Sequence, residues 1–166
     1  MPSPAPRLRV ATPADAAACA AIYAPSVRDT AITFELEAPD AAEMARRIEG
    51  ALRHHTWLVA EEGGEVLGYA YGGRHRVRAA YDTTAEVSVY LAEAARGRGL
   101  GRLLCERLLT DLAGRGLRLA VAGITLPNAA SVALHEHLGF EHVGTFRRVG
   151  WKFGEPHDVG WWQRDL

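Results

Sequence analysis

The sequence has few residues of several types, and each shortage excludes a class of protein. Among 166 residues there are only two cysteines, and Lys152 is the single lysine. Cys19 and Cys105 stand far apart, without zinc-ligand spacing, so we expect no metal site and two unpaired thiols in a reducing cytoplasm. No apolar run approaches the length that crosses a membrane, so no membrane association is expected.

Neither sign of charge predominates, since the formal net charge is −1. A nearly neutral chain has no electrostatic attraction for nucleic acid. Hydrophobic residues make up 48% and charged residues 23% of the chain, which is typical of a globular protein. We expect a short disordered, proline-rich leader over residues 1–6 and one domain over residues 7–166.

Hydrophobic periodicity and turn residues divide the chain into helices and strands. The expected elements are a strand at 8–10, a helix ending near Tyr23 before Pro25, a helix opening at 39–40, strands at 57–60 and 66–71 around a glycine turn, a loop at 74–81, a strand at 86–91, a leucine-rich helix at 100–114, a strand at 117–124, a helix at 128–138, and strands at 140–148 and 159–164. A hairpin followed by alternating helices and strands indicates an α/β protein with a mixed sheet.

The densest signal is a glycine-rich turn between the strand at 86–91 and the helix that follows. Its residues are Arg96, Gly97, Arg98, Gly99, Leu100 and Gly101, with Arg102 next in the chain. Glycines let the backbone approach a ligand and direct successive N–H groups into one concavity. The start of the helix adds partial positive charge. The turn therefore predicts a diphosphate site with three arginines around it.

Two other phosphate-binding fingerprints do not fit this turn. The dinucleotide pattern requires a different glycine spacing and an acidic residue at the end of a second strand. The P-loop requires a lysine after its last glycine, and the only lysine lies at position 152.

The spacing instead matches an acetyl-CoA signature, in which arginine or glutamine is followed by x-x-Gly-x-Gly or Ala. Arg96, Gly99 and Gly101 occupy its positions, and Asn128 begins a helix that is followed by Gly139-Phe140. With these two motifs the chain resembles the GNAT superfamily of N-acetyltransferases. Further stretches resemble the phosphinothricin and methionine sulfoximine acetyltransferase branch, namely 86–90, 121–124, 134–136, 149–154 and 157–163. This similarity extends from about residue 8 to the end of the chain.

The resemblance implies a fold and a co-substrate. The implied GNAT fold has a mixed, mostly antiparallel sheet with a β-bulge and two splayed parallel strands, flanked by helices. The co-substrate is acetyl-CoA, whose pantetheine arm would pair with the backbone of Val89, Tyr90 and Leu91. The Asn128 side chain would reach the pantetheine or phosphate region, and it can also serve as a helix cap.

The resemblance also assigns two catalytic groups. An amine must lose a proton before it attacks a thioester, and Glu86 is the implied general base, acting directly or through water. His135 lies seven residues after Asn128, where the wider superfamily usually has tyrosine and this branch has histidine. It would donate a proton or hydrogen bond to the leaving thiolate, with a purely structural role as the alternative.

A substrate loop at residues 74–81 is the last implied feature. Arg78, flanked by Val77 and Ala79, would bind a carboxylate or phosphinate. Phe34 and Tyr81 would form an apolar wall. The resemblance further implies a homodimer with its sites near the interface.

Three functions remain open at this point. The leading one is acetylation of a small amino-acid-like amine of the phosphinothricin, methionine sulfoximine or methionine sulfone type, in a ternary complex. The second is acetylation of peptide or protein N-termini, which an acidic open groove would favour. The arginine-rich loop instead favours an anionic small substrate. The third is a non-catalytic acyl-CoA-binding sensor, which would need neither Glu86 nor His135.

Overall fold

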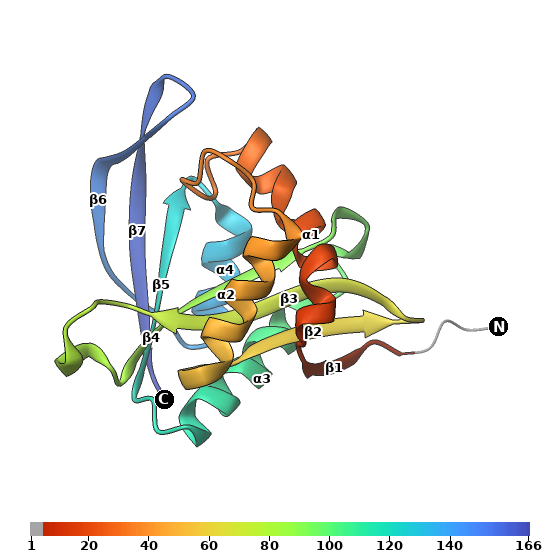
Figure 1. Cartoon of the computed structure of the whole chain (residues 1–166). Helices are drawn as coiled ribbons and strands as arrows, with labels where there is room; N and C mark the ends of the chain where they lie inside the picture. The colour runs from red at the N-terminus through yellow and green to blue at the C-terminus, as the bar shows by residue number, and fades with distance from the viewer. Residues whose placement is uncertain (1–4) are drawn as a thin grey trace.

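The computed structural model describes residues 5–166, so residues 1–4 of the expected leader lie outside the described residues. Figure 1 shows the elements in their places. They are β1 (Arg7–Val10), η1 (Pro13–Asp15), α1 (Ala16–Asp29), α2 (Ala41–His54), β2 (Trp57–Glu62), β3 (Glu65–Arg74), η2 (Ala79–Tyr81), β4 (Thr84–Leu91), η3 (Glu93–Ala95), α3 (Leu100–Gly114), β5 (Leu119–Leu126), α4 (Ala129–His137), β6 (Glu141–Lys152) and β7 (Glu155–Asp165).

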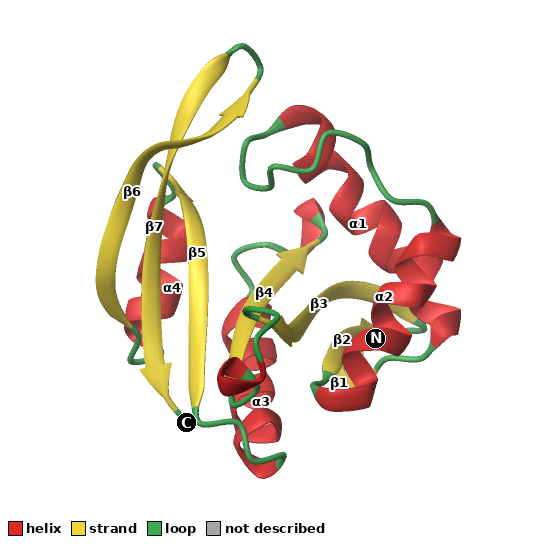
Figure 2. Cartoon of the chain, turned by 60° about the vertical axis from the view of Figure 1, so that its left-hand side comes forward, coloured by secondary structure: helices red, strands yellow, loops and turns green. Residues whose placement is uncertain are grey.

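The strands form one seven-stranded sheet in the order β1-β2-β3-β4-β5-β7-β6. All neighbours are antiparallel except β4 and β5. The parallel pairing of β4 with β5 covers only 84–86 against 119–121, and Figure 2 shows the two strands diverging beyond that point. The mixed sheet with one splayed parallel pair is as predicted.

Helices cover both faces of the sheet because its strands alternate apolar side chains. Trp57, Val59 and Tyr69 face α1 and α2, whereas Leu58 and Ala70 face α3. In β4 the same alternation directs one set of side chains toward α1 and α2 and the other set toward α3. Each side of the sheet therefore has its own core.

The first helix is longer than its sequence suggests. It was expected to end before Pro25, yet α1 continues to Asp29. Pro25 lies on the exposed side of the helix, and so does Ala21, whose carbonyl loses its usual helical donor. Burial of Val27, which is 1% exposed, favours continuation of the helix. Tertiary packing outweighs the local cost of the proline.

The β-bulge that the resemblance implied does not lie in the ladder between β3 and β4. The register between β3 and β4 runs without a break from Gly68↔Leu91 to Arg74↔Ala85, so no bulge lies in β4 on this side. Register shifts occur in the β2–β3 and β6–β7 ladders instead. The two parallel strands separate after Glu86↔Val121, which is their last paired position.

Candidate active site

The fork between β4 and β5 is a groove in the middle of the sheet. Beyond Glu86↔Val121 the two strands no longer pair, while β4 stays paired with β3. The peptide groups of β4 that face β5 are thus left without a neighbouring strand. The groove between them is lined by Ile32, 87–90, 122–125, Asn128, Ser131 and His135. Val89 and Tyr90, predicted to bind a cofactor, lie in this lining, and Leu91 follows them.

The glycine-rich turn stands where β4 and η3 lead into α3. Gly97 and Gly99 adopt positive φ values of 74° and 77°, which only glycine adopts without strain. The first backbone hydrogen bond of the helix runs from the Leu103 amide to the Gly99 carbonyl at 3.2 Å. Within residues 5–166, no acceptor is found for the successive amides from Gly97 to Arg102. The turn therefore presents a row of free donors at a helix start.

The three arginines of the turn differ in their surroundings. Arg98 bonds Glu62 at 2.6 Å and Arg102 bonds Glu106 at 2.7 Å. Both pairs are on the surface, where ion pairs are worth little and exchange readily for another anion. Arg96 makes none of the ion pairs found in the described chain, and it lines an 800 Å³ hollow between α1 and the end of β4.

The α4 helix places Asn128 and His135 beside the groove. The Asn128 carbonyl oxygen Oδ1 accepts from the Ser131 amide at 3.2 Å, so the predicted helix cap is confirmed. His135 is buried, and its Nδ1 donates to the Ser131 carbonyl at 2.7 Å because a carbonyl can only accept.

This hydrogen bond constrains the chemistry of His135. Burial lowers the pKa of the imidazole, against a smaller opposing effect of the Ser131 hydrogen bond. A neutral ring with its proton on Nδ1 has its lone pair on Nε2. Near neutral pH His135 is therefore an acceptor at Nε2, and the predicted proton donation requires an imidazolium that burial disfavours.

Glu86 lies at the last paired position before the fork, and its side chain is 37% exposed. Its Oε2 is 3.2 Å from Nδ1 of His75, at the C-terminal end of β3. The His75 ring contacts Tyr81 and Trp161 edge-on, with ring centroids 5.9 and 5.8 Å apart. An added Cβ on Gly123 would lie 3.0 Å from the Trp161 ring, so this ring covers the β5 side of the fork.

His75 and Trp161 are site residues that the sequence analysis did not select. His75 lies within the predicted substrate loop, but nothing in its spacing reveals a contact with Glu86. Trp161 belongs to β7, and its place follows from the Gly123↔Trp161 register. The sequence signal for Trp161 is its pairing with Gly123, and this signal can be recognised only when the register of the two strands is known.

The substrate loop itself lies open. Val77, Arg78 and Ala79 are exposed, and Val77 is 81% exposed. The Arg78 carbonyl accepts from the Tyr81 amide at 2.9 Å, which closes the η2 turn. Arg78 takes part in none of the ion pairs made by residues 5–166, so its guanidinium is available.

Phe34 lies elsewhere, against the β6–β7 hairpin. An added Cβ on Gly150 would lie 2.1 Å from the Phe34 ring, which therefore rests on that glycine. The ring also lies 6.1 Å from that of His157. Tyr81 packs on His75 instead, so the predicted wall of Phe34 with Tyr81 is not a contact in this chain; the two rings belong to different walls.

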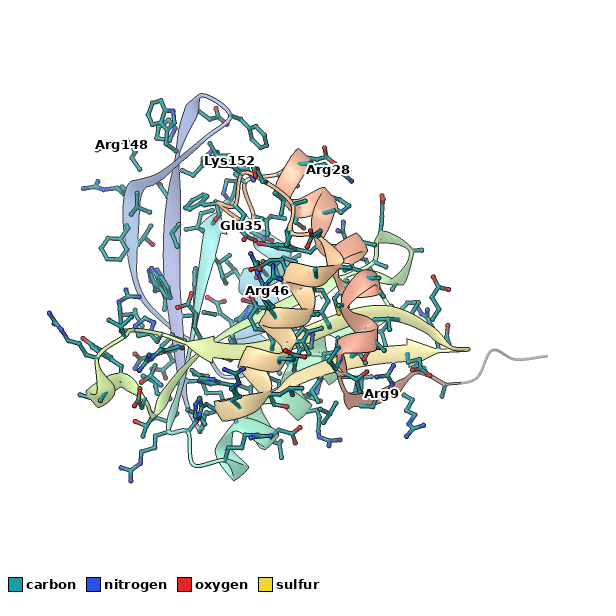
Figure 3. The ribbon with its side chains drawn as sticks, viewed as in Figure 1. Arg9, Arg28, Glu35, Arg46, Arg148 and Lys152 are labelled. Atoms are coloured by element: carbon teal, nitrogen blue, oxygen red, sulfur yellow. The ribbon has the colours of Figure 1, made fainter. Side chains whose placement is uncertain are left out.

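The segment that carries Phe34 is fastened by the buried Lys152. Its Nζ donates to the Val27 carbonyl at 2.7 Å and to the Thr33 carbonyl at 2.9 Å. Figure 3 shows Lys152 on the hairpin beside the segment that contains Glu35. Burial lowers the pKa of Lys152, and the charge of Glu35 partly opposes this shift.

Two features are absent from the described residues. Over positions 5–166, His, Cys, Asp and Glu side chains form no group of three or more suited to holding a metal ion. In the same range, no helix has both the length and the apolar character needed to span a bilayer.

Comparison with known sequences gives a consistent family. The model of the acetyltransferase (GNAT) domain matches residues 8–161. A phosphinothricin N-acetyltransferase of Streptomyces viridochromogenes is 41% identical over 159 residues, covering 96% of this chain and 87% of that protein. An L-methionine sulfoximine/L-methionine sulfone acetyltransferase of Salmonella typhimurium is 38% identical over 160 residues, covering 96% and 94%.

Solved structures agree with the sequence matches. A GNAT superfamily phosphinothricin acetyltransferase from Sinorhizobium meliloti, in complex with acetyl-CoA, superimposes with a TM-score of 0.93 at 37% identity, covering 97% of this chain and 88% of that one. A ribosomal-protein-alanine N-acetyltransferase from Brucella melitensis gives a TM-score of 0.93 at 38% identity, covering 96% and 99%.

Proposed function

Because the chain belongs to the GNAT acetyltransferase family, we propose that it transfers the acetyl group of acetyl-CoA to the amine of a small amino-acid-like substrate. One observation carries this proposal. The free amides from Gly97 to Arg102 begin the helix that follows β4, and the edge of β4 that faces β5 is unpaired beyond Glu86. A diphosphate fits the first and an extended amide-bearing chain fits the second. The acetyl-CoA complex of a similar enzyme supports the same co-substrate.

The residues of the fork divide the work of binding. Amides of the turn hold the diphosphate, with Arg96, Arg98 and Arg102 around it. The free edge of β4 at Val89–Leu91 pairs with the pantetheine arm as an added strand would. Asn128 keeps its capping bond while its exposed face borders the groove.

Proton transfer falls to Glu86, on the paired side of the fork. An ammonium must lose its proton before its nitrogen attacks the thioester carbon, and Glu86 accepts it directly or through water. A β4 amide polarises the thioester carbonyl. The leaving thiolate takes up a proton, for which His135 is a donor only when it is itself protonated.

The substrate class follows from the charge of the loop. The unpaired guanidinium of Arg78 matches a carboxylate or phosphinate in bidentate fashion, with Val77, Ala79 and Tyr81 beside it. Phe34 supplies an apolar wall from the hairpin side. Relatives named for phosphinothricin and for methionine sulfoximine or sulfone support an amine with an anionic or tetrahedral side-chain head.

A second candidate is acetylation of a protein N-terminus, which the similarity to a ribosomal-protein-alanine N-acetyltransferase favours. A thiol-release assay with acetyl-CoA separates the two. The panel contains phosphinothricin, methionine sulfoximine, methionine sulfone, ordinary amino acids and N-terminal peptides. We expect release with the small amines. Release with peptides alone would overturn the leading proposal, and release with none would overturn both.

We also propose that the protein is a homodimer. Within the described part of the chain, the outer edge of β6 borders no other strand. The strand carries exposed apolar side chains at Val143, Phe146, Val149, Trp151 and, just beyond its end, Phe153. An unpaired strand edge with exposed apolar side chains favours association with a second copy of the chain. Light scattering after gel filtration should give twice the mass of 18.0 kDa. A Trp151→Lys substitution, which puts a charge in this edge, should give the monomer.

Two smaller proposals complete the picture. Cys19 and Cys105 are both free and buried, which supports work in a reducing cytoplasm. The family match at residues 8–161 supports one domain over residues 7–166.

A further inference from the structure

His75 sits at the point where the two parallel strands separate. Gly73 pairs with Glu86 across the β3–β4 ladder, and His75 follows two residues later. Its side chain is only 16% exposed. The ring lies between Tyr81 from η2 and Trp161 from β7. Because Trp161 covers Gly123 in the lining of the groove, His75 borders the same fork as Glu86.

The hydrogen bond to Glu86 fixes how the imidazole carries its proton. An ionised carboxylate can only accept, so the 3.2 Å contact places a proton on Nδ1 of His75. Nε2 then bears the lone pair and is free to take a second proton. A carboxylate in this position orients the ring and stabilises the imidazolium that forms.

The groups that face the ring come from three elements. The Glu86 carboxylate comes from β4, and the aromatic rings of Tyr81 and Trp161 come from η2 and β7. The Arg76 guanidinium bonds the His75 carbonyl at 3.0 Å. The Arg74 guanidinium is turned to Asp82, at 3.2 Å. Among residues 5–166, Glu86 is therefore the one carboxylate that contacts the ring.

We propose that His75, oriented by Glu86, is the group that removes the proton from the substrate ammonium. This inference rests on the acetyltransferase function proposed above and changes the part played by Glu86. Imidazoles as a class are stronger bases than carboxylates and so are better matched to an ammonium. The pair works as one unit, with His75 accepting and Glu86 holding the counter-charge.

The step balances without any further reactant. The N–H bond of the ammonium breaks and its proton joins Nε2 of His75. The freed lone pair forms the bond to the thioester carbon, and the C–S bond breaks with its electrons on sulfur. The nitrogen loses a second proton as the amide forms. One of the two protons converts the thiolate to the thiol of coenzyme A and the other passes to solvent, so His75 ends neutral.

Two substitutions of His75 test the proposal. His75→Phe keeps the ring shape without nitrogen, and His75→Asn keeps a donor close to the place of Nδ1 but has no Nε2. Both should lower kcat by about two to four powers of ten, with acetyl-CoA affinity by calorimetry unchanged. Both should also remove the acid limb of the wild-type kcat/KM profile. His137→Asn, on the exposed end of α4, is the control and should behave as wild type.

The outcomes separate this inference from the function on which it rests. Activity of His75→Asn near wild type, with loss in His75→Phe, would show that His75 only positions Glu86 and would overturn the proposal. Normal activity and an unchanged acid limb in both variants would overturn it as well. A wild-type protein that binds no acetyl-CoA, or acetylates no amine, would instead remove the proposed function itself.

Discussion

The turn at residues 97–102 and the group around Glu86 are built in opposite ways. The turn draws all its donors from one short stretch, with two glycines of positive φ and a helix start beside them. The group around Glu86 is collected from β3, η2, β4 and β7, and His75 is 86 positions from Trp161 along the chain. The co-substrate side therefore depends on one short stretch of sequence, whereas the amine side forms only when the strands of the sheet pair.

The largest expected effect would separate the two sides at once. Glu86→Gln should lower kcat by about two to four powers of ten, because it removes the charge that supports proton removal. The turn is untouched, so acetyl-CoA affinity should stay the same. Steady-state rates and calorimetry measure the two quantities. Near-normal turnover would take Glu86 out of the chemistry.

The opposite result is expected from a change in the turn. Gly99→Ala places a side chain at φ 77°, a conformation that costs a non-glycine residue about 1–2 kcal/mol. Acetyl-CoA should bind about tenfold more weakly, while kcat at saturation is kept. Gly114→Ala, in open space at the far end of α3 and without positive φ, is the matched control. Equal affinity in both variants would contradict the role of the turn.

The hairpin wall offers a smaller and more selective effect. Gly150→Ala directs a methyl group into the Phe34 ring, which must move. The KM for the amine should rise about fivefold, since displaced positioning groups weaken productive binding, and the KM for acetyl-CoA should not change. Gly144→Ala on the same strand has open space around its Cβ and should be silent. An amine KM that is the same in both variants would remove Phe34 from the amine site.

The smallest effect concerns stability and pH. Burial lowers the pKa of His135 in the folded chain. As the pH falls below ~6.5, the His135 imidazole therefore binds a proton in the unfolded chain before it does so in the folded chain. The contribution of His135 is full above that pH and is lost as the pH falls through it. Burial lowers the pKa of His55 as well, so it adds to the same slope.

Urea unfolding between pH 5.5 and 7.5 checks this expectation. His135→Gln should flatten the loss of stability on acidification, because the variant has no proton to take up at that position. His137→Gln, an exposed neighbour, should leave the slope as it is. Identical slopes in the two variants would mean that His135 titrates alike in both states.

Local patterns were sufficient to predict much of the molecule. The capping role of Asn128 and the helix after Gly99 follow from neighbouring residues, and both are confirmed. The same reasoning went wrong where distant packing decides. α1 continues through Pro25 because Ser26 and Val27 in its last turn are buried. In the leucine-rich helix not every leucine is buried: Leu103 is 45% exposed because the core lies on the side of Leu104 and Leu108.

The site shows the same division. The residues of the turn were found from a motif, and their roles stay predictions until binding is measured. His75 and Trp161 were missed because their contacts depend on strand register. The separation of Phe34 from Tyr81 was missed for a similar reason, since each ring packs on a different part of the folded chain.

The position of Lys152 has a practical consequence. It is the only lysine in the sequence, and its buried ε-amine donates to two carbonyls that lie more than a hundred positions earlier in the chain. The folded surface thus offers no side-chain amine to an acylating reagent, and none to the acetyl donor that the enzyme itself would carry. The rate of acylation at position 152, followed by mass spectrometry, would then report how often the β6–β7 hairpin opens, because the Lys152 amine reacts only when it is exposed.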